Sequence, residues 1–407
     1  MIGEKIYSLE STTKWNHVMS MIWLYFMLFP TGTLFNISIP VLLILIFDRK
    51  NRNNQILVPL FILLLPTLAL NITQPYMDIK SIVRLLSFAL IFLTFASYKG
   101  EKILFPYVLF AVCYILLSQI SIIFSIPYLA NFYDSTYHIS EMAFEKHSVD
   151  LSNVDVADVA VKTRLGGMFI NPNNCASYIS VAYAVGLCEA ERDTLKQKIL
   201  FYLFIAITMI STLITGSRTG FIVIAAITLY YLYSKGYSLR RYIILGVILG
   251  VPLVTWLLYE DLSDLSNVRA FNVSEGMEGS VGAKMSIFIN YLSKCSNPIW
   301  WLFGAGDIMV TLDVYQLGME GTDMDFGNIF IVFGFFFYVL YVLICIRIFR
   351  LLEPQYRVIM FVLLWSFSNS ILISYRMCPV FFLALGLLYK RSCCGIENEK
   401  EKELCTC

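Results

Sequence analysis

Residues 164–174 read Arg164-Leu165-Gly166-Gly167-Met168-Phe169-Ile170-Asn171-Pro172-Asn173-Asn174, and they lead directly into an apolar run. Asn171 is a suitable helix cap and Pro172 suits the first helical position, so this stretch predicts the start of a membrane-embedded helix. The glycines let the backbone approach a ligand closely. Backbone donors at an open helix end, next to an arginine, favour an anion. The alternative is a capped span whose arginine extends to the membrane surface.

The composition around this stretch is that of a membrane protein. The 407 residues are 58% hydrophobic with a net charge of +1, and the mean hydropathy is +0.70. No soluble domain of this size is so apolar, and the small net charge does not indicate nucleic acid binding. Residues 1–14 are polar and show no cleavable signal-peptide pattern.

Cofactor chemistry has little support in the sequence. No Walker-type glycine loop is present, so ATP is not indicated. The three histidines are too scattered for a metal site, and the ten cysteines fit no standard ligand spacing. We expect reduced cytosolic thiols, no cofactor and no metal; a metal site in the cysteine-containing tail is the alternative.

Apolar runs of near-spanning length recur and predict an all-α polytopic membrane protein with about 12 transmembrane helices. The first two runs are short and are separated by Pro30-Thr31-Gly32, so they form either two spans or one broken span, which would make 11. The predicted spans are about 18–29, 33–47, 56–70, 81–97, 103–126, 167–188, 198–214, 219–234, 242–259, 326–346, 356–374 and 377–389.

Lysine and arginine indicate the orientation of this single membrane domain, residues 1–407. Six basic segments hold 18 of the 30 basic residues, and two apolar runs separate each neighbouring pair. One alternation therefore places all six in the cytoplasm, together with both termini and a tail at 390–407. Two acidic loops, 127–166 and 260–325, are then predicted on the outer, periplasmic face, and residues 281–294 of the second favour an amphipathic helix.

A second motif, Thr215-Gly216-Ser217-Arg218-Thr219-Gly220, separates two apolar runs. A single helix across both runs would be about 54 Å long, well beyond a bilayer, so the chain must turn near Gly216. The turn places Arg218 at the outer border. The alternative for Arg218 is an interfacial anchor without a ligand.

Four arginines are predicted at the outer ends of different spans, and their shared placement suggests a phosphate-bearing ligand. Scattered interfacial anchors are the alternative. The second outer loop adds two cations and several acids, one of which could accept a proton from a sugar hydroxyl; a solvated acidic loop is the alternative. The arginines are Arg84, Arg164, Arg218 and Arg376; the loop cations are Arg269 and Lys284; the acids before the tenth span are Glu320, Asp323 and Asp325.

From about residue 160 onward the chain resembles the bacterial O-antigen polymerase and O-antigen ligase family of polytopic membrane glycosyltransferases. Two motifs that carry the resemblance are residues 164–174 and 215–220. The third runs from Lys284 through Pro298 to Leu302-Phe303-Gly304-Ala305-Gly306. The first 160 residues are similar only in topology. The resemblance implies the membrane architecture of C-type glycosyltransferases.

The resemblance implies a polymerase that joins undecaprenyl-diphosphate-linked oligosaccharide units into O-antigen, capsular or related surface polysaccharide at the outer face of the cytoplasmic membrane. It also implies two partners, a chain-length regulator and a flippase. Lys284 stands where the family often has arginine. The ligase branch usually has a histidine before the tenth span; here Asp325 takes that position, which favours a polymerase.

Two other functions remain open, a flippase of lipid-linked saccharides and an O-antigen ligase. The predicted catalytic residues are Arg164, Arg218 and Asp325, and the predicted substrate-binding residues are Arg84, Asn171, Asn173, Asn174, Ser217, Arg269, Lys284 and Arg376.

Overall fold

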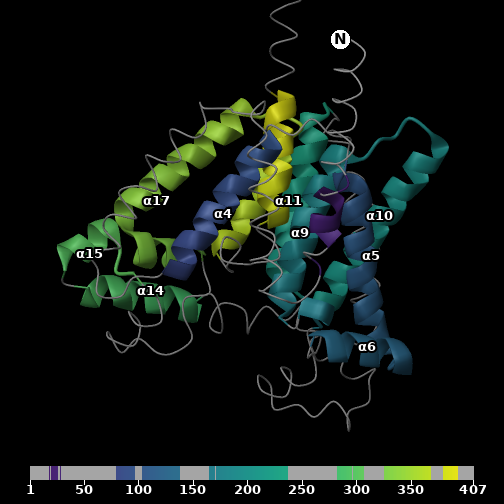
Figure 1. Ribbon diagram of the computed structural model, residues 1–407, viewed down its shortest axis with the longest axis horizontal. Helices are drawn as coiled ribbons and strands as arrows, with labels where there is room; N and C mark the ends of the chain where they lie inside the picture. The colour runs from purple at the N-terminus through teal and green to yellow at the C-terminus, as the bar shows by residue number, and fades with distance from the viewer. Residues whose placement is uncertain are drawn as a thin grey trace, which may run out of the picture. The chain divides into compact units, whose positions relative to one another are not determined.

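The computed structural model describes residues 18, 20–25, 28, 79–96, 103–137, 165–169, 171–236, 282–295, 297–306, 325–367 and 379–392. These residues form helices and turns, without a strand among them (Figure 1). Three helices in this part of the chain are long and apolar enough to cross a membrane: Leu104–Ile123, Leu195–Thr215 and Gly327–Leu351. The all-α class is therefore confirmed for the described residues, and the three helices support membrane embedding. The count of 12 spans stays a prediction.

The chain divides into two compact units, one of residues 108–277 and one of residues 1–107 with 278–407. The described elements of the first, apart from the opening turn of α5, are α5 (Leu104–Ile123), α6 (Pro127–Tyr137), η2 (Gly167–Phe169), α9 (Pro172–Glu189), α10 (Leu195–Thr215) and α11 (Arg218–Ser234).

Helix α9 is the core of the 108–277 unit, where it packs against both α10 and α11. Most of its side chains are buried, and many are small, which lets neighbouring helices approach closely. A Cβ added at Gly186 would collide with the ring of Phe204 on α10, and one at Gly220 on α11 would lie 3.1 Å from the Cβ of Ala176. The predicted span at 167–188 is therefore surrounded largely by protein.

The start of α9 confirms the predicted cap and corrects the predicted boundary. The side chain of Asn171 accepts a hydrogen bond from the backbone N–H of Asn173 at 2.9 Å, and Pro172 occupies the first turn. The helix does not begin at Gly167, because proline disfavours helical backbone in the residue before it and Asn171 is extended. Gly167 to Phe169 form a short 3-10 turn instead.

The α10–α11 hairpin is confirmed at the predicted position. Helix α10 ends at Gly216, which has φ 57° and ψ 24°, a left-handed conformation that glycine adopts without steric cost. Ser217 then caps α11 and accepts a hydrogen bond from the N–H of Gly220. The chain reverses within two residues, so neither helix exceeds the thickness of a bilayer.

The other unit contains α4 (Ile79–Ala96), α14 (Gly282–Lys294), α15 (Pro298–Phe303), α17 (Asp325–Leu351) and η4 (Arg357–Phe367), with a further helix over residues 379–392. Helix α4 packs along this last helix: the rings of Phe88 and Phe382 stack at 5.6 Å, and those of Phe92 and Tyr389 lie at 5.8 Å. Residues 357–367, part of the predicted span 356–374, form a 3-10 helix rather than an α-helix.

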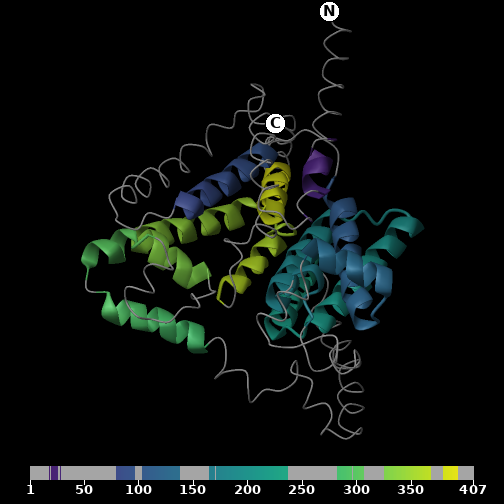
Figure 2. The ribbon, with the colours of Figure 1, turned by 60° about the horizontal axis from the view of Figure 1, so that its bottom comes forward.

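The amphipathic helix predicted at 281–294 is confirmed as α14 for the residues described. Phe288 and Leu292 pack against Phe330 and Ile331 of α17. Helix α14 ends at Lys294, and Asn297 caps α15. Both views show α15 beside the first part of α17 (Figure 1 and Figure 2).

The predicted span at 326–346 lies within α17, which the sequence did not predict to be interrupted: at Gly334 the backbone leaves the helical conformation, with φ 79° and ψ 179°. The break lies where the backbone after α15 meets α17: the N–H of Ala305 donates to the carbonyl of Ile331 at 2.7 Å. A Cβ at Gly334 would strike the backbone of Phe303 and Gly304, and a Cβ at Gly304 would strike that of Val332. Two glycines thus allow two backbones to touch.

Candidate functional site

The two motifs singled out in the sequence meet within the 108–277 unit. The hydroxyl of Ser217 donates to Oδ1 of Asn173 at 3.2 Å, which joins the cap of α11 to the first turn of α9. The N–H of Leu165 donates to the carbonyl of Ile214 at 3.4 Å, near the end of α10. We call this meeting point the junction: residues 165–169, the first turn of α9 and residues 211–218.

A buried amide from α5 holds the junction together. Gln119 is fully buried, and its Nε2 donates to the carbonyl of Leu165 at 3.3 Å and to that of Ser211 at 3.2 Å. The Sγ of Cys175 lies 3.8 Å from the same nitrogen. One side chain therefore touches the 165–169 segment, α9 and α10.

The neighbouring residue on α5 adds a second attachment. The N–H of Met168 donates to the hydroxyl of Ser118 at 3.2 Å. Gly167 has φ 55°, and a Cβ there would collide with the Ser118 hydroxyl and lie 3.0 Å from Cγ of Gln119. Gly167 is therefore needed because the backbone passes close to α5. The sequence predicted that the glycines allow close approach to a ligand, but the neighbour that Gly167 approaches here is α5.

Two buried polar atoms beside the junction have no hydrogen-bond partner among the described residues: Oε1 of Gln119 and the hydroxyl of Ser211. Burying such groups unpaired costs free energy, and native proteins carry few of them. Gln119 and Ser211 therefore each keep a buried oxygen that can still form a hydrogen bond at the junction.

The electrostatics of the junction favour an anion. Helices α9 and α11 both begin there, and the N-terminus of a helix carries partial positive charge with free N–H groups. Residues 165–169, 171–177 and 208–220 contain no aspartate or glutamate. The nearest acid on α9 is Glu189 at its far end, about 27 Å away for a helix of this length.

Four predicted substrate-binding residues, together with the backbone of the predicted catalytic residue Arg218, lie at the junction. Arg218 is the first residue of α11. In the other unit, Arg84 lies in α4, Lys284 in α14 and Asp325 at the start of α17. The residues at the junction are Asn171, Asn173, Asn174 and Ser217; Arg164, Arg269 and Arg376 lie outside the described residues.

Sequence reasoning missed Ser118, Gln119 and Ser211. A signal for the first two was present: Ser118-Gln119 interrupts the apolar run 103–126. A polar amide inside a span is costly and is therefore often functional. The predicted site contained charged residues, asparagines and Ser217 but not this neutral pair.

A further arginine, Arg192, is structural rather than available for a ligand. Its guanidinium carbon lies 3.7 Å from the centre of the Phe201 ring, and its Nη2 donates to the carbonyl of Leu187 at 3.4 Å and to the Tyr231 hydroxyl. These contacts tie α9, α10 and α11 together at the end opposite the junction. Its charge serves packing through a cation–π contact.

Among the described residues, no group of three histidine, cysteine, aspartate or glutamate side chains is placed so that it could hold a metal ion. No protein-family model matches this chain, and no curated protein matches it.

Proposed function

We propose that this protein is a membrane polysaccharide polymerase that extends a saccharide chain held on undecaprenyl diphosphate. The observation that carries the proposal is the hydrogen bond between Asn173 and Ser217. It joins the helix N-termini of two motifs, residues 164–174, which the sequence predicted to favour an anion, and residues 215–220, which carry Arg218. Two such N-termini, in described segments 165–169, 171–177 and 208–220 that contain no aspartate or glutamate, suit a diphosphate.

The proposed reaction is a glycosyl transfer between two lipid-linked saccharides. A hydroxyl oxygen of the incoming repeat unit forms a bond to the anomeric carbon of the growing chain. The bond from that carbon to the lipid diphosphate breaks, and its electron pair leaves with the diphosphate. The hydroxyl proton passes to a carboxylate, for which Asp325 is the candidate. The glycosyl diphosphate supplies the free energy, so no nucleotide is required.

In this proposal the junction stabilises the negative charge that develops on the leaving diphosphate. Arg164 precedes the fastened segment 165–169, and Arg218 follows the cap of α11. Fixed cations and N–H groups aimed at a leaving group are the most effective form of electrostatic catalysis. The amides of Asn171, Asn173 and Asn174 can donate to phosphate or sugar oxygens.

The remaining predicted contacts form part of the same proposal. Arg84, Arg269, Lys284 and Arg376 would bind the rest of the two substrates. The protein would lie in the bacterial cytoplasmic membrane with both termini inside, and would work with a flippase and a chain-length regulator.

The test compares Arg164→Ala and Arg218→Ala with a matched control, Arg347→Ala, which removes an exposed arginine of α17. Polysaccharide from cells carrying each variant is resolved on a gel. The first two should abolish long chains while the protein still inserts at normal levels, and the control should retain them. A ladder of normal length from Arg164→Ala or Arg218→Ala would refute the role of these residues.

A gene deletion separates the polymerase from its rivals. Loss of a polymerase should leave a lipid-linked single repeat unit at the outer face. Accumulation of that unit at the inner face would identify a flippase instead. Full-length chains that fail to attach to their final acceptor would identify a ligase.

A further inference from the structure

Helix α5 carries an exposed apolar stripe along one side. Phe110 and Leu117 in α5 and Phe124 directly after its last residue recur every seven residues, which places them on one helical face, and they are 44%, 44% and 72% exposed. Helix α5 has 20 residues and is therefore about 30 Å long, the thickness of the hydrocarbon core. The stripe is thus suited to face lipid along a full span.

The stripe continues onto α6 after a sharp turn. Ser125 has φ 46°, an unusual value for a residue with a side chain, and α6 then crosses the end of α5 (Figure 1). On α6, Tyr128 is 91% exposed and Phe132 is 49% exposed. Asn131 and Ser135 are exposed on the same face. A helix face that mixes aromatic rings with small polar groups suits the border between lipid and water.

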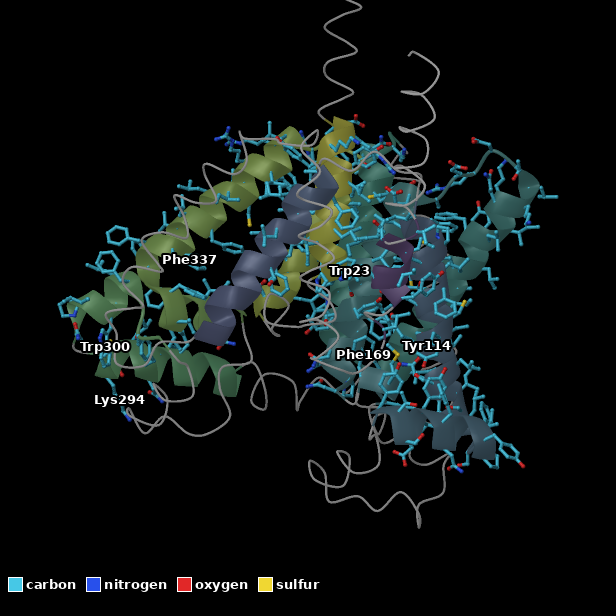
Figure 3. All side chains as sticks on the ribbon, viewed as in Figure 1. Trp23, Tyr114, Phe169, Lys294, Trp300 and Phe337 are labelled. Atoms are coloured by element: carbon cyan, nitrogen blue, oxygen red, sulfur yellow. The ribbon has the colours of Figure 1, made fainter. Side chains whose placement is uncertain are left out.

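The opposite face of α6 is fastened, so the exposed rings cannot turn inward. Tyr133 and Tyr137 are buried. The Tyr133 hydroxyl donates to the carbonyl of Tyr114 on α5 at 3.3 Å, and the Tyr137 hydroxyl donates to the Tyr114 hydroxyl at 3.2 Å. Figure 3 labels Tyr114 on α5. Helix α6 also packs against η2, part of the junction.

We propose that α6 lies in the bilayer interface and inserts Phe124, Tyr128 and Phe132 between the headgroups and the acyl chains. The lipid bilayer is the occupant because the exposed rings continue the stripe of a helix that is long and apolar enough to span. Since α6 contacts η2, this anchor sets the junction at headgroup depth. The inference does not depend on the proposed function, because it concerns the depth of a helix and not a reaction.

The test measures membrane depth with spin labels. A ketone-bearing amino acid at position 124, 128 or 132 accepts a label without reaction at the native cysteines, in full-length protein reconstituted into phosphatidylcholine–phosphatidylglycerol vesicles. Relaxation by oxygen against relaxation by a water-soluble nickel chelate reports depth. Two reference positions set the scale: Ile210, 47% exposed in the last two turns of α10, and Asp193, exposed in the α9–α10 turn.

Labels at all three test positions should give depths between those of the two references, with position 124 closest to Ile210. Depths at 128 and 132 equal to that of Asp193 would place α6 in water and overturn the proposal. Dipolar broadening between labels at 128 would indicate a second copy on this face and would overturn it as well.

A photocrosslinking measurement guards against a labelled variant that is misfolded. A benzophenone amino acid at position 128 should form lipid adducts, because this side chain is almost fully exposed and its replacement removes no internal contact. Adducts to another copy of the chain, or no lipid adducts at all, would contradict the interfacial placement.

Discussion

Replacing Gln119 with leucine tests whether one amide holds the junction. Leucine preserves most of the volume but removes the hydrogen bonds to the carbonyls of Leu165 and Ser211. Each bond contributes about 0.5–1.5 kcal/mol net, so their combined loss is about 1–3 kcal/mol. Oε1 of Gln119 has no partner among the described residues, and its removal offsets part of the cost. We expect a net loss of about 2 kcal/mol, confined to the attachment of residues 165–169.

Hydrogen exchange measures this loss directly, because the N–H groups of Leu165 and Met168 donate the hydrogen bonds that attach residues 165–169 to α10 and α5. A local loss of about 2 kcal/mol predicts roughly 30-fold faster exchange at these two amides. Mass spectrometry of peptides covering residues 165–169, with the protein in lipid nanodiscs, provides the measurement.

The control is Ser121→Ala, two residues further along the same helix. The Ser121 hydroxyl is buried and donates to the carbonyl of Ser118 within α5, so its removal should leave exchange at residues 165–169 unchanged. Exchange at Leu165 and Met168 that is equally slow in Gln119→Leu and in the unmodified protein would refute the account of Gln119. Under the proposed function, Gln119→Leu should also shorten the polysaccharide ladder.

Three further predictions concern stability. Gly334→Ala should lower the free energy of unfolding, measured by thermal unfolding, by more than about 2 kcal/mol, because position 334 combines positive φ with a backbone clash. The control Gly236→Ala should cost only about 1 kcal/mol in the same assay, because position 236 has positive φ but open space around it. Arg192→Lys should cost about 1–2 kcal/mol through its lost ring stacking and donors, whereas Arg347→Lys on an exposed face should be neutral. Burial raises the pKa of Tyr133, so the contribution of this side chain to the free energy of unfolding is complete below the unfolded pKa of about 10 and is lost as pH rises further. In Tyr133→Phe, the free energy of unfolding should no longer fall in this alkaline range for that reason, which unfolding measured at a series of pH values would show.

Helix boundaries were predictable because capping is local. Asn171 and Pro172 start α9, and the chain turns at Gly216 and Ser217. Each involves groups only a few residues apart, so the side chains alone specify the backbone. The presence of an anion-suited helix start could be predicted for the same reason.

The arrangement of these ends was decided by the tertiary structure alone. No local rule brings Asn173 to Ser217, directs Gln119 toward two distant carbonyls, or interrupts α17 at Gly334. Each depends on a partner from a segment far away in the chain, whose position follows from helix packing. The amino-acid sequence by itself determined an apolar helical protein and the chemistry of its helix ends. Tertiary packing determined which ends meet, because hydrogen bonds and backbone contacts between remote segments form only when packing has brought both groups within reach.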